Sequence, residues 1–182
     1  MRRLIRNCYL TAVTLVGTAL CQHAFAELRD PQSYFFNESF GDFAEELDNA
    51  RDEGKNGVLI MFQQADCPYC ERMRKTVLNH SSVQEFFRRH FLIFHVDIEG
   101  DLEITDFNGM ETVEKDFAFW QNRVRATPVF AFFDLEGTRV ARYTGATTDI
   151  EEFMLLGRYV VDEIYQSMSF NRYKREQQTK QP

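Results

Sequence analysis

Two cysteines three positions apart, Cys67 and Cys70, stand between a short apolar run and a segment with helical character. The run Val58–Phe62 is apolar throughout, which is typical of a strand buried on both faces of its sheet. The following segment, Glu71–Leu78, is predicted to be a helix that ends at Asn79–Ser82. A strand buried on both faces needs helices on each side of the sheet, so this stretch alone predicts a layered α/β domain.

The remaining chain continues the alternation of helical and strand patterns. Before the cysteines, a helix is predicted with Phe40, Phe43, Leu47 and Ala50 on one face. After them follow a helix at 83–89 capped by Ser82, a strand at 91–98, and an acidic loop at 99–109 with a short strand at 103–105. The last predicted elements are a helix at 110–122 through Val113, Phe117 and Trp120, two strands at 129–133 and 138–143 joined by a turn at 134–137, and a helix at 149–168. The early strands are joined by helical crossovers and should be parallel, whereas the last two form a hairpin. The order predicts a mixed central β-sheet flanked by helices.

The chain ends differ in composition from this central part. Residues 1–26 combine early arginines, an apolar run too short to span a bilayer comfortably and a small-residue site ending at Ala26, a pattern typical of a cleaved signal peptide. An uncleaved N-terminal anchor is the alternative. Residues 27–39 are predicted to be an N-terminal arm, residues 40–169 the domain, and residues 170–182 a polar, frayed tail. The expected location is therefore the periplasm.

Cleavage after Ala26 changes the charge and the cysteine count of the mature chain. The full chain carries a formal charge of −7, and the lost segment contains three arginines and no acidic residue, so the mature chain is more acidic still. This charge disfavours nucleic acid and anionic membranes as partners. Of the four cysteines, only Cys67 and Cys70 remain. A pair so close together closes almost no loop and adds little stability, so its presence favours reactivity.

The position of the pair predicts how it would react. Cys67 falls at the start of a helix, where unpaired N–H groups stabilise an anion, so its thiolate should be favoured and its pKa lowered. Pro68 suits the first helical turn, and Cys70 lies about one turn further on, within reach of the first sulfur. Cys67 is thus predicted to attack and Cys70 to resolve. A zinc site or a purely structural disulfide remains an alternative, but the mature chain has no further cysteine, and no metal or other cofactor is expected. His95 is expected to be a satisfied histidine of the core or of a sheet edge.

A second element precedes the late hairpin, in the segment Val124–Val129. Pro128 is either an ordinary proline at the start of a strand or the second residue of a cis Thr127–Pro128 bond that faces the cysteines. Composition does not choose between these two interpretations.

Together, these features resemble the thioredoxin superfamily over roughly residues 40–168. The resemblance is carried by the strand–CxxC–helix at 58–78, the Thr127–Pro128 segment, the hairpin turn at 134–137 and the Tyr143-Thr144-Gly145 sequence before the last helix. It implies that Pro128 is cis and that Pro68, Tyr69, Thr127 and Pro128 bind an extended segment of a partner protein next to the redox disulfide Cys67–Cys70.

Within the superfamily, the chain looks most similar to exported thioredoxin-related reductases of the SoxW type. That resemblance implies a protein that reduces disulfides in partner proteins and is itself reduced by a membrane-bound electron donor. A monomer is expected, because no dimerisation module is visible in the sequence. The direction of electron flow is not fixed by the residues, and a Dsb-type oxidant or isomerase is one alternative. A copper-binding module that uses the two thiolates is another.

The chain departs from the thioredoxin pattern at two places. Asp66 stands where thioredoxins have the Trp before the first cysteine, and the inner pair Pro68-Tyr69 is that of glutaredoxins. Met61 occupies the position of the buried Asp that helps the resolving cysteine, so Glu71 or water would have to replace that proton acceptor.

Overall fold

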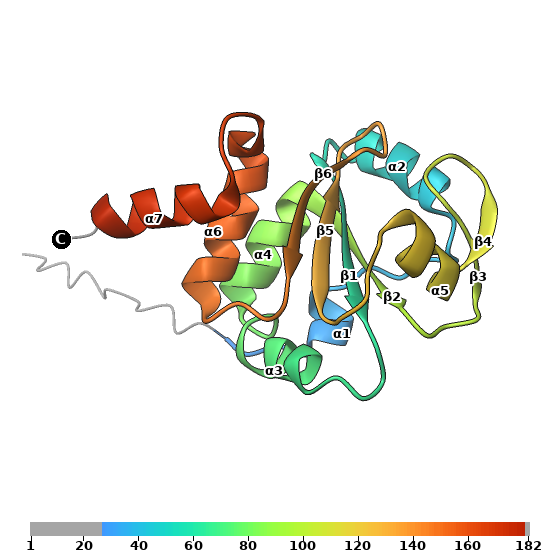
Figure 1. Ribbon diagram of the computed structural model, residues 1–182, viewed down its shortest axis with the longest axis horizontal. Coiled ribbons are helices and arrows are strands. Elements are labelled where there is room, and N and C mark those ends of the chain that lie inside the picture. Colours follow the sequence, from blue (N-terminus) through green and yellow to red (C-terminus); the bar gives the residue numbers. More distant parts are fainter. Residues whose placement is uncertain (1–26, 181–182) are drawn as a thin grey trace, which may run out of the picture.

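The computed structural model describes residues 27–180, so the predicted signal peptide at 1–26 lies outside the described residues. A four-stranded sheet has the order β2-β1-β5-β6 (Figure 1). Its strands are β1 (Gly57–Gln63), β2 (Phe91–Asp97), β5 (Val129–Phe133) and β6 (Arg139–Thr144). β1 is parallel to β2 and antiparallel to β5, and β5 is antiparallel to β6. The predicted mixed sheet is confirmed.

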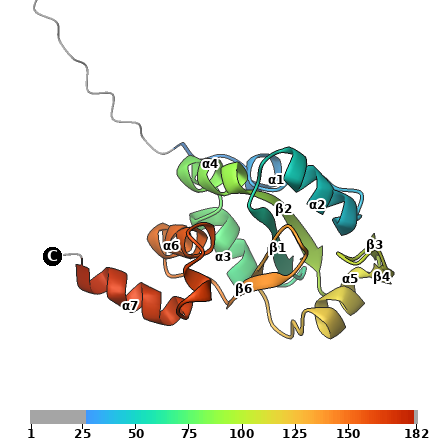
Figure 2. The same cartoon turned by 90° about the horizontal axis from the view of Figure 1, so that it is seen from above.

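Helices cover both faces of this sheet (Figure 2). Leu59 and Met61 of β1 belong to the hydrophobic core that underlies α3 (Pro68–Thr76), α4 (Ser81–His90) and α6 (Ile150–Val161). Alternate residues of β1, including Val58 and Ile60, belong to a second core under α2 (Phe43–Asp52) and the short helix α5 (Glu114–Asp116). All of β1 from Val58 to Phe62 is fully buried, as expected for a strand with helices on both sides.

The segment predicted as an N-terminal arm is packed into the domain. It contains the short helix α1 (Pro31–Tyr34), and the two residues after it, Phe35 and Phe36, are buried in the core. Asn37 then pairs with β2: its N–H donates to the carbonyl of Ile93 at 2.7 Å, and its Oδ1 accepts from Ile93 N at 2.9 Å. The aromatic pair therefore contributes to the domain's core, although the polar residues around it favoured an arm.

Two predicted helix starts differ from the structure. Helix α2 begins at Phe43, because the Asp42 side chain accepts from Glu45 N and caps the helix, and this leaves Phe40 outside it and fully exposed. Helix α4 begins at Ser81, so the predicted cap Ser82 lies inside the helix, and the actual N-cap residue, His80, makes no side-chain capping bond.

The region predicted as one helix at 110–122 contains a strand and a shorter helix. The predicted strand at 103–105 is β3 (Glu103–Thr105), and it pairs with β4 (Glu111–Val113) in a separate two-stranded sheet. Helix α5 follows and continues as a π-helix, η1 (Phe117–Gln121). Phe117 is buried as predicted, whereas Trp120 is 71% exposed.

The C-terminal region is also more structured than its composition predicts. Helix α6 ends at Val161, short of the predicted 168, because Glu163 adopts a left-handed conformation (φ 54°) before the 3-10 turn η2 (Ile164–Gln166). The predicted frayed tail forms α7 (Phe170–Lys180), and the ring of Phe170 packs edge-on against Tyr143 and Tyr159. Between residues 27 and 180, no helix has the length and apolarity needed to cross a membrane.

Candidate active site

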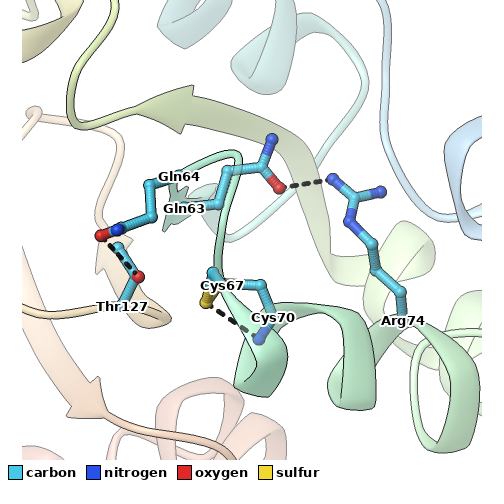
Figure 3. The surroundings of a disulfide bond; sticks show 6 residues. All are labelled: Gln63, Gln64, Cys67, Cys70, Arg74 and Thr127. Carbon is cyan, nitrogen blue, oxygen red and sulfur yellow. Dashed lines mark hydrogen bonds between the residues drawn. A yellow bond between two sulfur atoms is a disulfide. The ribbon is translucent and has the colours of Figure 1, made fainter.

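The two cysteines lie where β1 passes into α3, at the edge of the sheet formed by the carboxyl ends of β1 and β2 (Figure 3). Cys67 is the N-cap residue of α3, and its Sγ accepts a hydrogen bond from Cys70 N at 3.0 Å. A disulfide bond joins Cys67 to Cys70, with the two Cα atoms 5.2 Å apart. The predicted placement of one sulfur at the mouth of a helix and the second a turn away is confirmed.

The four residues of the CPYC segment differ sharply in exposure. Cys67 is 8% exposed and Cys70 is 4% exposed, so both sulfurs are largely shielded. Pro68 and Tyr69 face solvent, and Tyr69 is 61% exposed. The first helical turn therefore exposes its inner pair to solvent, while the two cysteines between which that pair stands are largely buried.

The shielding behind the sulfurs comes from apolar and thioether side chains. Met61 and Met73 are fully buried in the same core cluster as Cys67 and Cys70. Glu71, the suggested replacement for the missing buried carboxylate, lies on the exposed side of α3 and pairs with Lys75 at 2.6 Å. The hydrogen bond from Lys75 lowers the pKa of Glu71, which makes Glu71 a weaker proton acceptor than an unpaired glutamate.

The opposite wall of the site is the Thr127–Pro128 segment at the start of β5. Its peptide bond is cis, as the resemblance implies. The Thr127 hydroxyl donates to Gln64 Oε1 at 3.1 Å, and Gln64 lies in the loop between β1 and Cys67. Figure 3 shows these two side chains meeting beside Cys67. The structure thus brings Thr127 and Pro128 to the cysteines, although about 60 residues separate them in sequence.

On the other side of β1, a polar cluster borders a pocket of about 590 Å³ that Cys67 and Cys70 help to line. Arg74 donates to Gln63 Oε1 at 2.5 Å and lies over the ring of Phe36, 4.8 Å from its centre. Gln63 Nε2 lies 3.4 Å from Nδ1 of His95, which also contacts Phe36 edge-on. Burial, helped by the charge of Arg74, lowers the pKa of His95, so the ring is neutral near pH 7. His95 is thus a satisfied histidine, as expected.

Sequence reasoning missed Arg74 and Gln64 as parts of this site. Arg74 follows Cys70 by four residues and so lies on the same face of α3. This spacing could have predicted that Arg74 lies close to the site. No local sequence pattern predicts the hydrogen bond between Gln64 and Thr127, because it forms only when β5 lies next to β1.

The fold and this site define a protein of the thioredoxin fold with a disulfide-bonded CxxC pair, an arrangement that indicates a redox-active site. The chain belongs to the family described as the thioredoxin-like domain, whose model matches residues 43–160.

Solved structures similar to this chain also share the fold. A thioredoxin-fold protein from Helicobacter pylori is 19% identical over 82% of this chain and 99% of its own, with a TM-score of 0.61. A thioredoxin from Thermus thermophilus is 25% identical over 66% of this chain and 85% of its own, with a TM-score of 0.52. A candidate disulphide-isomerase from Bacteroides thetaiotaomicron is also 25% identical, over 69% of this chain and 95% of its own, with a TM-score of 0.52. Among curated protein sequences, none matches the chain.

Proposed function

We propose that this protein is an extracytoplasmic thiol–disulfide oxidoreductase of the SoxW type that reduces disulfide bonds in partner proteins. The observation that carries the proposal is the disulfide between the N-cap residue of α3 and a residue one turn further on, next to the cis Thr127–Pro128 segment. This arrangement lets one sulfur react with a partner while the second waits within bonding distance.

The proposed reaction transfers two electrons from the protein to its partner. In the reduced form, the Cys67 thiolate attacks one sulfur of the partner disulfide, and the other partner sulfur leaves as a thiolate that takes up a proton. The Cys70 thiol then loses its proton and attacks Cys67 Sγ, which breaks the mixed disulfide and releases the second partner sulfur as a thiolate. The Cys67–Cys70 bond is the oxidised product, and a membrane-bound dithiol donor would reduce it again.

The cis-proline wall provides the proposed docking surface for the partner. Thr127 is half-buried, and its side chain is already held by Gln64, which leaves its backbone to pair with an extended segment. Exposed Pro68 and Tyr69 would contact the same segment. The proposal therefore includes strand-like docking of a partner loop that carries the disulfide.

Trapping tests this division of roles between the two sulfurs. Cys70→Ser should accumulate mixed disulfides with partner proteins in the native compartment, because the resolving step is lost. Cys67→Ser is the matched control, and it should form no such adducts and show no insulin-reduction activity. Adducts that form equally well with both variants, or with neither, would refute the assignment.

The direction of electron flow is tested by the reduction potential of the pair, measured against glutathione. A reductase needs a potential near that of thioredoxin, about −270 mV, whereas a potential near −120 mV would favour a Dsb-type oxidant. Each 30 mV corresponds to about 1.4 kcal/mol, so the two outcomes are well separated. Stoichiometric Cu(I) binding by the reduced protein without insulin reduction would instead favour the copper-binding alternative.

Export is the remaining part of the proposal, and it rests on the pattern of residues 1–26. N-terminal sequencing of the protein from a periplasmic extract should give a first residue of Glu27. A first residue of Met1, with the protein retained in the membrane fraction, would favour an uncleaved anchor.

A further inference from the structure

Three arginines, Arg123, Arg139 and Arg142, lie together beside the segment that leads into the cis-proline, and Arg125 follows Arg123 by two residues in that segment. The chain as a whole carries a net charge of −7, so the charge of this cluster is opposite to that of the whole chain. Eight ion pairs join arginines or lysines to carboxylates between residues 27 and 180, and none of them includes one of these four arginines. Within residues 27–180 the cluster is therefore not neutralised by a contacting acidic side chain.

Neutral backbone and amide oxygens hold two of these arginines in place. Arg139 Nη1 donates to Asn122 O at 3.0 Å and to Asn122 Oδ1 at 3.2 Å. Arg142 Nη1 donates to Asn122 O at 3.2 Å and to Arg123 O at 3.3 Å. Asn122 is buried and is itself anchored to the carbonyl of Phe117. Burial and the nearby charges of Arg142 and Arg123 lower the pKa of Arg139, as expected for cations held together without a counter-ion.

A β-bulge in β6 explains why both Arg139 and Arg142 reach the same asparagine. Phe133 pairs with Arg139 and Phe132 pairs with Ala141, so Val140 is an extra residue in the strand. Val140 and Ala141 consequently both pack against the core, and Arg139 and Arg142 both turn to the other face. The bulge thus places the side chains of Arg139 and Arg142 on the same face of the sheet.

Aromatic side chains extend this surface. The guanidinium of Arg125 lies over the ring of Phe119 at 4.6 Å from its centre, and Phe119 contacts Trp120 edge-on at 4.6 Å. Trp120 is 71% exposed. Tryptophan and arginine are among the residue types most enriched at the positions that contribute most of the binding energy in protein interfaces.

The cluster lies next to the proposed docking site of the partner. Arg125 precedes Thr127 by two residues, and Arg142 precedes Thr144 by two residues. Thr144 pairs with Val129, the residue after Pro128. Two residues of a strand span about 7 Å, so a segment held at Thr127 would reach the arginines within a few of its own residues. Figure 2 shows the chain after α5 running towards β6, where Arg142 donates to the carbonyls of Asn122 and Arg123.

We propose that the surface formed by Trp120, Arg123, Arg125, Arg139 and Arg142 binds an acidic segment that flanks the reacting cysteine of the partner protein. This inference rests on the proposed function and names its substrate class: proteins whose target disulfide has aspartates or glutamates close to it in sequence. The arginines attract the segment over a distance and then pair with its carboxylates, while Trp120 packs against its apolar atoms. The overall negative charge of the chain disfavours a nucleic acid as the occupant.

Two disulfide-bridged peptides test the proposal. They share one sequence, except that three residues beside the disulfide are Asp or Glu in one peptide and Asn or Gln in the other. The rate constant for their reduction by the dithiol protein is measured at low and high salt. The acidic peptide should react about fivefold faster at low salt, and the preference should shrink at high salt because the ion pairs are exposed.

Variants decide whether the arginines cause this preference. Arg125→Gln combined with Arg142→Gln should bring the ratio of the two rate constants close to one. Arg89→Gln, on the exposed last turn of α4, is the matched control and should keep the wild-type ratio.

Four outcomes would overturn the inference. Equal rates for the two peptides with the wild-type protein would leave the proposed function intact and remove the acidic preference, whereas no reduction of either peptide would remove both. An equal slowing of both peptides by the double variant would indicate a purely structural role for the arginines. Tighter binding of a DNA oligonucleotide than of the acidic peptide at the same salt would favour a polyphosphate ligand.

Discussion

The carboxylate of Glu152 holds the last helix, α7, against the domain. Glu152 is 7% exposed and accepts hydrogen bonds from Lys174 Nζ at 2.6 Å, from Thr148 N at 2.9 Å and from the Tyr143 hydroxyl at 3.1 Å. Burial opposes ionisation, but these donors outweigh it and lower the pKa of Glu152 to about 2. Burial and the same carboxylate raise the pKa of Tyr143 to about 12.

The lowered pKa of Glu152 indicates how much the ionised carboxylate contributes to the free energy of unfolding. A fall from 4.5 to about 2 corresponds to about 3 kcal/mol of stabilisation of the folded state. Lys174 is 28% exposed, so screening by solvent reduces the figure to about 2 kcal/mol. Because the pKa is lower in the folded than in the unfolded chain, this stabilisation is fully present above pH 4.5 and is lost as the pH falls through about 2.

Glu152→Gln should therefore lower the free energy of unfolding by about 2 kcal/mol at pH 7 and by about half as much at pH 3. Urea unfolding followed by circular dichroism at the two pH values measures both numbers. Glu151→Gln is the matched control, since Glu151 is exposed and adjacent, and it should change stability by less than about 0.5 kcal/mol. An equal loss at both pH values, or an equal loss in the control, would refute the reasoning.

Three further predictions concern the core and the thiols. Gly157→Ala should destabilise the protein by about 2 kcal/mol in thermal unfolding although alanine favours helix, because the new Cβ would lie 2.6 Å from Phe86 Cε1 and 2.7 Å from Phe87 Cζ. An unchanged melting temperature would contradict such close packing of α4 on α6. Phe36→Ala should cost about 3 kcal/mol in urea unfolding, and Phe40→Ala, at a fully exposed site, less than about 0.5 kcal/mol. Equal losses would show that the 27–39 segment is not part of the core. In the reduced protein, the absorbance of the Cys67 thiolate should appear with a midpoint below about 8.5, the value of a free cysteine, and a midpoint at or above that value would count against activation by α3.

The central strands were predictable because their signal is local. Val58–Phe62 and Val129–Phe133 are continuous apolar runs. Such a run is sufficient to indicate a strand that is buried on both faces of its sheet. The start of α3 at Cys67 was predictable for a similar reason, because Pro68, the next residue, suits the first turn of a helix. The 110–122 region was harder to interpret, because Val113 and Phe117 fit a helical spacing even though Val113 ends a short strand.

The parts of the site that the sequence did not predict depend on register and on packing across the sheet. His95 meets Gln63 because β2 is parallel to β1 with Met61 opposite His95, a pairing that no local pattern encodes. The docking of α7 likewise depends on Lys174 reaching a carboxylate 22 positions earlier. A polar composition is common to frayed tails and to helices that dock through a few side chains, so composition alone could not separate them.

If the protein reduces partner disulfides as proposed, the partial burial of Cys67 and Cys70 restricts which disulfides can reach the pair. Cys67 is only 8% exposed and Cys70 only 4% exposed, so little of either residue is open to an incoming sulfur. A disulfide on a flat, rigid surface would reach so recessed a pair less easily than one carried on a thin, protruding loop. Under the proposed function, partners would thus be selected by how far their disulfide protrudes from the surrounding chain.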